Sequence, residues 1–489
     1  MIRAARIAGP GREYLVDDEP VDIHLADGRI VDIAPTGALR AVGAVWDADG
    51  SWVIPGLWDN HVHAVQWALA AERVALGDAV SAQDAASRMA AVTPLPDGRR
   101  VGAGYRDALW SDAPTLAALD ATTGTTPTYL INADVHSVWL NSAALAREGY
   151  RGDDGVLREE DAFEISRRLN AVDPVHGDRA VIAAGERAAE RGVTGLVDFD
   201  MAWNADAWPR RVAAGFASHR VEFAVYPFDL GRAINAGLRT GDLRESRETP
   251  EAARGLIRVG PLKVISDGSL GTRTAACSHA YPDDPDNFGV LTVPTDALIA
   301  LLTRAAGAGL DAAVHAIGDR AATSALDAFG VSGAAGTIEH AQLLRHTDLA
   351  RFARLGIVAS VQPQHALDDR DLAARLWAPQ DGLGYPLASL RGAGIEVRFG
   401  SDAPVAPLDP WQAMAAAVTR TDDDRAPWHP EERFTIDQAL RASTRSEVRP
   451  GEVADLVVCG RDPRGADGDE LRRMPVEATI LAGRVTHLA

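Results

Sequence analysis

Lys263 is the only lysine in a chain of 489 residues, although lysine and arginine together number 49. Arginine serves about as well as lysine as a hydrated surface charge, so a surface role would hardly need this exception. A buried lysine can lose its proton, whereas arginine, with a pKa above ~12, cannot. A neutral amine can form a Schiff base, act as a base, or add carbon dioxide to become a carbamate that binds metals. The alternative is that one lysine survived by chance.

Two histidines at alternate positions, His61 and His63, follow an apolar run. In a strand, residues i and i+2 point to the same face, so both imidazoles would aim at one point, as metal ligands do. His315, His340 and Asp402 close three later apolar runs. One such position means little by itself. Four histidines and one aspartate at the ends of successive predicted strands favour a metal site.

Short apolar runs alternate with helical stretches through the middle of the chain. This alternation predicts parallel βα units, about eight of which form a (β/α)8 TIM-like barrel, with active-site residues at the carboxyl ends of the strands. A doubly wound open sheet is the alternative, but no G-x-G-x-x-G motif stands where that fold would need it. The predicted strands are 193–200, 221–226, 256–266, 311–317, 337–341, 357–364 and 396–402. The predicted helices include 179–191, 295–308 and 347–355.

Both ends of the chain are typical of short strands and turns. We expect 1–54 and 440–489 to pair into one small β-sandwich domain beside a barrel domain over 55–439. About 130 residues separate His63 from the next barrel strand, which is far longer than an ordinary loop. We therefore expect an inserted lid subdomain at 66–178. Its predicted elements are helices at 81–92, 115–121, 137–147 and 159–169 and a strand at 128–133.

The net charge of −20 argues against nucleic acid or anionic membrane as a partner and leaves a small-molecule substrate. No signal peptide and no stretch near ~18 apolar residues is recognised, so a cytoplasmic location is expected. Cys277 and Cys459 allow one disulfide and exclude a disulfide-rich secreted scaffold. The oligomeric state stays open, a homodimer included.

The residues at the strand ends, in their order and with their neighbours, resemble the amidohydrolase superfamily. The resemblance covers nearly the whole chain and begins with IPGLWDNHVH at 54–63. It is similar in more detail to the branch of YtcJ-like proteins and N-substituted formamide deformylases. The motifs that carry this are GPLKVISDGSLGTRTA at 260–275, VHAIGD at 314–319, SVQP at 360–363, GSDAP at 400–404 and DVHSVWLNSAAL at 134–145.

This resemblance implies the ligand set of a metal centre and a reaction. The ligands would be His61, His63, Lys263, His315, His340 and Asp402. The first two histidines would hold one divalent ion and the other two a second, with carboxylated Lys263 as the bridge. The expected metal is Zn²⁺, with Mn²⁺, Fe²⁺ and Co²⁺ as alternatives. A metal-bridging hydroxide would attack an amide, N-acyl or N-formyl C–N bond, and Asp402 would move the proton.

Two alternatives stay open. The first is a mononuclear hydrolase or deaminase of the same fold in which Lys263 is an unmodified amine. No glutamate stands three positions after His315, which argues against a nucleobase deaminase. The second is a non-catalytic assembly protein of this fold, as in dihydropyrimidinase-related proteins. Those proteins lose ligands, whereas this chain retains the full set.

A further group of residues could contact the substrate: His136, Asp267, Ser269, Arg273, Gln362 and His365. His136 could reach over the site to the substrate carbonyl, or it could hold its own loop. Arg273 could bind a substrate carboxylate through its fork, or it could order its loop in a salt bridge. Asp59 is expected to orient His61 or His63 from behind.

Overall fold

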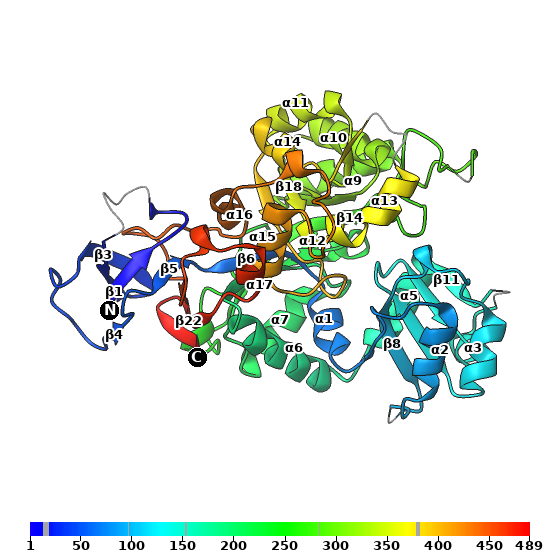
Figure 1. The fold of residues 1–489 in the computed structure, drawn as a ribbon, viewed down its shortest axis with the longest axis horizontal. Helices are drawn as coiled ribbons and strands as arrows, with labels where there is room; N and C mark the ends of the chain where they lie inside the picture. Colours follow the sequence, from blue (N-terminus) through cyan, green and yellow to red (C-terminus); the bar gives the residue numbers. More distant parts are fainter. Residues whose placement is uncertain (13–18, 96, 152–153, 283, 378–381) are drawn as a thin grey trace.

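In the computed structural model, which describes residues 1–12, 19–95, 97–151, 154–282, 284–377 and 382–489, a parallel sheet forms the centre of the fold (Figure 1). Eight strands of the described residues follow one another in the order β20-β18-β16-β15-β14-β13-β12-β6. They are β6 (Leu57–Val62), β12 (Val193–Asp198), β13 (Arg220–Val225), β14 (Ile257–Ile265), β15 (Ala312–Ala316), β16 (Gly336–His340), β18 (Val358–Val361) and β20 (Val397–Phe399).

The two edge strands of this sheet meet and nearly close it into a barrel. Just beyond the end of β20, Ala403 forms a parallel bridge with Val62 of β6. The Asp402 N–H donates to the His61 carbonyl at 2.7 Å, and the His63 N–H donates to the Ala403 carbonyl at 2.9 Å. The predicted (β/α)8 TIM-like barrel is therefore confirmed.

The barrel strands are buried on both faces, which is why they occur in the sequence as continuous apolar runs rather than alternating ones. Every residue of β6, β12 and β15 is buried. The predicted strand 357–364 is too long, because the observed strand ends at Val361 and helix α12 (Pro363–Asp368) comes next. Proline lacks an N–H, so Pro363 suits the first turn of this helix better than the inside of a sheet.

Helices cover the outside of the barrel. They include α6 (Pro174–Ala189), α7 (Asn204–Ala213), α9 (Thr295–Gly307), α10 (Asp319–Ser332), α11 (His346–Leu355), α15 (Pro410–Thr419) and α16 (Ile436–Ala442). Helix α9 shows how they bind the barrel, since Leu298, Leu302 and Ala305 recur at helical spacing and are all buried. The predicted helices 179–191, 295–308 and 347–355 correspond to α6, α9 and α11.

Both chain ends contribute to one sheet, at the left of Figure 1. Its order is β23-β22-β21-β5-β1-β2-β3, and β4 (Trp46–Asp47) also pairs with β1. The strands are β1 (Ile2–Ile7), β2 (Val21–Ala26), β3 (Arg29–Pro35), β5 (Trp52–Pro55), β21 (Leu456–Cys459), β22 (Val476–Leu481) and β23 (Arg484–Leu488). The two ends join where β5 and β21 run antiparallel, with Val53 opposite Val458. The strands fall within 1–54 and 440–489, while those domain limits stay predictions.

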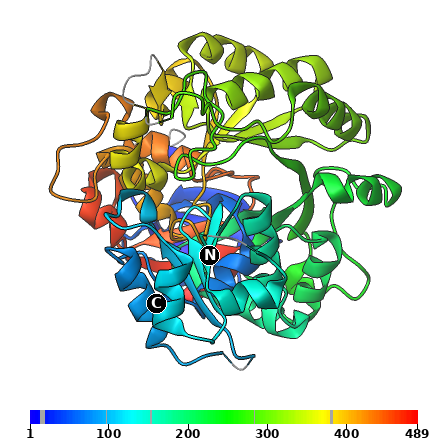
Figure 2. The same cartoon turned by 90° about the vertical axis from the view of Figure 1, so that its right-hand side faces the viewer.

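Between β6 and β12 the chain builds a second α/β unit, on the side of the barrel away from the end sheet (Figures 1 and 2). Its sheet has the order β11-β10-β9-β8-β7. The strands are β7 (Val74–Ala75), β8 (Arg100–Tyr105), β9 (Thr128–Asn132), β10 (Ser137–Leu140) and β11 (Val156–Arg158). The helices include α2 (Ala82–Ala90), α3 (Leu116–Thr123), α4 (Ser142–Glu148) and α5 (Glu160–Asn170). We call this unit, from β7 to α5, the insertion.

The helix predicted at 137–147 is wrong in its first half. Ser137–Leu140 forms strand β10, which pairs antiparallel with β9. Helix α4 begins only after Asn141, whose side chain accepts a hydrogen bond from the Ala144 N–H and caps the helix. An asparagine cap directly before a helix marks its start, and this signal outweighs the helical spacing upstream.

Two expectations from composition can be compared with the structure. Among the described residues, no helix combines the length and the apolar character that a membrane crossing needs. Cys277 and Cys459 are both buried free thiols, so the disulfide that the cysteine count allowed is not formed.

The closure of the barrel predicts the effect of a substitution at Gly400. A Cβ there would lie 2.7 Å from the backbone nitrogen of His61 and 2.8 Å from its Cβ, too close for either atom. Gly400→Ala should therefore push β6 away from β20 and destabilise the fold by about 1–3 kcal/mol, measured by thermal unfolding. Gly392→Ala is the control, since a Cβ there meets nothing within 4 Å. Equal melting temperatures for the two variants would contradict this packing.

Candidate metal centre

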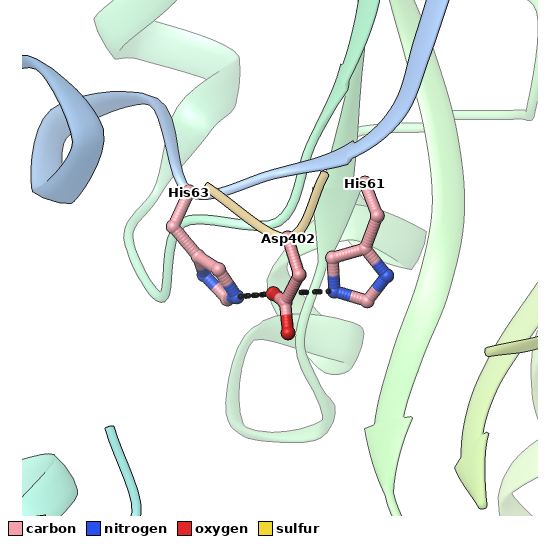
Figure 3. Close-up of side chains that lie close together, drawn as sticks. All are labelled: His61, His63 and Asp402. Atoms are coloured by element: carbon pink, nitrogen blue, oxygen red, sulfur yellow. Dashed lines mark ion pairs between the residues drawn. The ribbon is translucent and has the colours of Figure 1, made fainter. Parts of the chain in front are cut away.

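Three side chains from the two edge strands of the barrel point toward one another (Figure 3). His61 lies in β6, His63 comes directly after β6, and Asp402 comes after β20. The Oδ1 atom of Asp402 lies 3.3 Å from Nε2 of His61 and 3.3 Å from Nε2 of His63. The pairing of β6 with the segment after β20 places this carboxylate between the two imidazoles.

The other two predicted histidines approach from neighbouring strands. His315 lies in β15 and His340 ends β16, and their ring centroids are 4.6 Å apart. The ring of His340 also lies 4.9 Å from that of His61. His365, which we expected to contact substrate, stacks on His340 with ring centroids 6.2 Å apart. Donor atoms of His340, His365 and Asp402 lie within 4.8 Å of one another, as do those of the first group.

Lys263 extends from β14 into the same cluster and is only 2% exposed. Its Nζ lies 3.4 Å from Nε2 of His61 and 4.3 Å from the ring centroid of Phe199. Burial lowers the pKa of Lys263 to about 8, although the charges of Glu339 and Asp402 oppose this. Near neutral pH the neutral amine is therefore much more accessible than for a lysine in water.

Two buried carboxylates hold the histidines from behind. His61 Nδ1 lies 2.7 Å from Glu339 Oε2, and His315 Nδ1 lies 2.9 Å from Asp267 Oδ1. These hydrogen bonds leave the Nε2 atom of each ring available to a metal. Burial lowers the pKa of both histidines, most strongly for His61, where Lys263 adds to the effect. The rings are therefore neutral, which is the form that binds metals.

Asp267 and one further acidic residue, Asp59, also hold backbone groups behind the centre. Asp267, which we expected to contact substrate, is fully buried and accepts hydrogen bonds from the backbone N–H groups of Ile317 and Gly318 as well as from His315. Asp59 accepts from the N–H groups of His61 and Ser401, so it orients the backbone of a ligand rather than its ring. Burial raises the pKa of Asp59 to about 7.

The donors present fit a divalent metal ion. Imidazoles and carboxylates are ligands for Zn²⁺ and for Mn²⁺, Fe²⁺ and Co²⁺. Within the described residues, His63 Nδ1, His340 Nδ1 and His365 Nε2 are buried without a hydrogen-bond partner. Buried polar atoms rarely remain without a partner, so these nitrogens of His340 and His365 are candidate ligand atoms, whereas His63 faces Asp402 with its Nε2.

These side chains line a cavity of about 390 Å³ that is shared by the barrel and the insertion. The barrel supplies the predicted metal ligands, and the insertion supplies His136, Phe163, Ser166 and Asn170. Of the predicted substrate contacts, the lining includes His136, Ser269 and His365 but not Asp267, Arg273 and Gln362. The insertion therefore forms part of the site, as a lid would.

Glu159 fastens the insertion to the barrel beside the cavity. Its Oε2 lies 3.0 Å from Nδ1 of His136, whose ring centroid is 5.8 Å from that of His315. Its Oε1 accepts hydrogen bonds from Thr272 at 3.1 Å and Thr274 at 2.6 Å, in the loop after β14. His136 is thus held at the cavity wall by a carboxylate that also binds the opposite loop.

Sequence reasoning missed Glu159, Glu339 and Asp200, which also lines the cavity. Glu339 could have been predicted from the sequence, because a glutamate in a buried strand beside a ligand residue needs a hydrogen-bond partner. Asp200 stands at the end of a predicted strand, where active-site groups gather. Glu159 carried no signal, since its hydroxyl partners lie more than 110 residues further along the chain.

Residues 44–487 match the model of the Amidohydrolase family. The chain belongs to this family. The predicted resemblance is confirmed, and the chain has the fold of the metal-dependent hydrolases of this family.

Several relatives of this amidohydrolase match it over most of their length. Protein LONG AFTER FAR-RED 3 of Arabidopsis thaliana is 28% identical over 520 residues, covering 94% of this chain and 86% of the relative. Amidohydrolase YtcJ of Bacillus subtilis strain 168 is 26% identical, covering 90% and 89%. N-substituted formamide deformylase of Arthrobacter pascens is 26% identical, covering 94% of each chain. The solved structure of a metal-dependent hydrolase from Pyrococcus horikoshii OT3 superposes with a TM-score of 0.79 at 24% identity, covering 96% and 98%.

The contact between His136 and Glu159 predicts a change in titration. Burial alone would lower the pKa of His136, but the hydrogen bond and charge of Glu159 raise it above its ordinary value. Glu159→Gln in this amidohydrolase should therefore lower the pKa of His136, measured by histidine-selective NMR titration. Glu160→Gln is the matched control, because Glu160 is exposed and pairs with Arg167. A His136 pKa that is equal in both variants would contradict this contact.

Proposed function

We propose that this protein is a metal-dependent hydrolase that cleaves a C–N bond in a small amide, N-acyl or N-formyl compound. The observation that carries the proposal is the convergence of four histidines, Lys263 and Asp402 on one cavity of about 390 Å³. The similarity to N-substituted formamide deformylase over 94% of both chains supports the choice of a C–N bond.

In the proposed centre, two divalent ions, with Zn²⁺ as first choice, would be held by His61, His63, His315, His340 and Asp402. Lys263 would bridge them as a carbamate, formed when its neutral amine adds carbon dioxide and releases one proton. The burial of Lys263 beside His61 supports this, and arginine could not replace it because it stays protonated. When bound, such ions polarise a carbonyl and lower the pKa of a water molecule.

Asp402 is the proposed proton carrier. Burial favours its neutral form, but the hydrogen bond with His63 lowers the pKa of Asp402 below its ordinary value. The carboxylate is therefore ionised at neutral pH and can accept a proton from the attacking water. The same proton can then pass to the leaving nitrogen, so one group acts first as base and then as acid.

A second candidate is a mononuclear hydrolase or deaminase. The compact group of His61, His63 and Asp402, with donor atoms within 4.8 Å, would suit a single ion. Lys263 would then stay an unmodified amine and stabilise the negative oxygen of the intermediate. A non-catalytic assembly role remains the remote alternative, since every proposed ligand is present. The two candidates differ in the state of Lys263 and in the number of metals.

The carbamate can be tested because Lys263 is the only lysine side chain, and a carbamate on the N-terminal amine of Met1 would persist in the Lys263→Arg variant. Metal-loaded protein in ¹³C-bicarbonate should show a carbamate carbon by NMR that is absent in Lys263→Arg. The variant should also bind fewer than two metals and lose about a hundredfold or more in kcat/KM. A fully active Lys263→Arg variant would contradict the bridging role of Lys263. One bound metal per chain and no carbamate signal in the unsubstituted protein would favour the mononuclear candidate.

The role of Asp402 predicts a separate effect on turnover. Asp402→Asn keeps the size of the side chain but cannot accept the proton, so kcat should fall by about 10²–10⁴. Activity would be followed on N-formyl, N-acetyl and N-carbamoyl compounds, and metal content by mass spectrometry would separate a proton-transfer defect from metal loss. A variant with normal metal content and normal kcat would rule out Asp402 as proton carrier.

A further inference from the structure

Apart from the metal-binding side chains, much of the cavity wall is apolar. Both the barrel and the insertion contribute carbon surface, including Val65, Phe163, Met201, Leu270 and Leu372. Burial of an alkyl or aryl group against such a surface is favourable by roughly 25 cal/mol per Å² of apolar area. The cavity is therefore shaped for a substrate that carries a sizeable apolar group next to the reacting bond.

The basic side chains of the wall either form ion pairs with carboxylates or belong to the metal centre. The lining contains Arg106, Arg167 and Lys263, of which Lys263 belongs to the metal centre. Arg106 forms an ion pair of 2.9 Å with Asp368, which also lines the cavity. Arg167 pairs with two glutamates of its own helix α5, Glu164 at 2.7 Å among them. A carboxylate already offsets the positive charge of each guanidinium, so the attraction of either arginine for a substrate carboxylate is weakened.

Two aspartates of the wall have a different environment. Asp107 accepts a hydrogen bond from the Asn132 amide at 2.8 Å, and Asp134 accepts from the Ser269 hydroxyl at 2.8 Å and from the His136 N–H at 3.0 Å. These donors are neutral, and within the part of the chain that the structure describes neither carboxylate belongs to an ion pair. Burial and the charge of Asp134 raise the pKa of Asp107, as expected for two uncompensated carboxylates.

No other group in the outer wall reverses this balance. His136 adds no uncompensated positive charge, because the carboxylate of Glu159 lies 3.0 Å from its Nδ1. Arg273, which we expected to bind a substrate carboxylate, lies outside the lining. The wall outside the metal centre thus combines carbon surface and paired arginines with carboxylates that, among the described residues, belong to no ion pair: Asp107, Asp134, Asp200 and Asp369.

We infer that the cavity accepts amides whose nitrogen carries an apolar substituent ending in a neutral or cationic group, and that it rejects those ending in a carboxylate. This inference rests on the proposed function, because it names the substrate class of the same site. An ammonium near Asp107 and Asp134 gains two partners, whereas a carboxylate there meets like charge without a free arginine. N-Acyl amino acids are thereby excluded, and N-acylated alkyl or aryl amines and diamines are favoured.

The test uses three N-formyl compounds of matched length on the metal-loaded protein. They are derived from hexylamine, from 1,6-diaminohexane and from 6-aminohexanoate, so that only the far end differs in charge. We expect kcat/KM and the calorimetric affinity to be at least about tenfold lower for the carboxylate than for the other two compounds. A carboxylate compound that binds as well as the ammonium compound would overturn the inference, as would failure of both other compounds to bind.

The Asp107→Asn variant tests whether the cavity wall, rather than the metal ions, discriminates between substrates by the charge at their far end. The amide oxygen can still accept from Asn132, while the negative charge is lost. The disadvantage of the carboxylate compound relative to the ammonium compound should shrink by about threefold or more in this variant. Asp78→Asn is the control, since Asp78 is exposed on the insertion and pairs with Arg88. An identical ratio of the two compounds in both variants would overturn the role of this wall.

The two readouts separate this inference from the proposed function. If the compounds bind in the expected order but none is hydrolysed, also as acetyl and carbamoyl derivatives, the proposed reaction is wrong and the charge selection stands. If all three are hydrolysed equally well, the proposed reaction stands and the charge selection is wrong.

Discussion

The backbone pairing between β6 and the segment after β20 is the constraint on which the site depends. It joins the first and last strands of the barrel, so residues more than 330 positions apart in the chain share two short hydrogen bonds at His61 and His63. Because side chains alternate along a strand, this register turns both imidazoles to the face that Asp402 also reaches. A shift of one residue would send the imidazoles to the outside of the barrel.

Burial then sets the chemistry of the groups that the barrel gathers. In a medium of low dielectric, histidines lose protons readily and carboxylates hold theirs unless they are hydrogen-bonded. In the structure, each of three buried carboxylates contacts an imidazole: Glu339 lies behind His61, Asp267 lies behind His315, and Asp402 lies between His61 and His63. Each pair stabilises one protonation state and one orientation. The result is an ionised carboxylate beside imidazoles that burial keeps neutral at His61, His315 and His340, an arrangement suited to positive ions.

Features that depend on local pattern could be predicted from the sequence. Buried parallel strands occur as apolar runs with ligands at their ends, so the barrel and the positions of His315, His340 and Asp402 were accessible in this way. Contacts set by tertiary packing were not. Nothing in the sequence shows that Glu159 reaches Thr272 and Thr274, or that Asp267 turns behind His315 rather than toward substrate. The prediction of a helix at 137–147 was wrong in its first half for a related reason. Ser137–Leu140 forms a strand because it pairs with β9, which is a tertiary contact.

The attachment of the insertion to the loop after β14 has a consequence for evolution. Glu159 and Asp134 on one side, and Thr272, Thr274 and Ser269 on the other, belong to segments that are distant in sequence. An exchange of the insertion between relatives would therefore separate its carboxylates from the hydroxyl donors that bind them in this chain. A chimaera would therefore have to take the insertion and the loop after β14 from the same parent. Only then would the insertion keep its hydrogen bonds to the barrel beside the cavity.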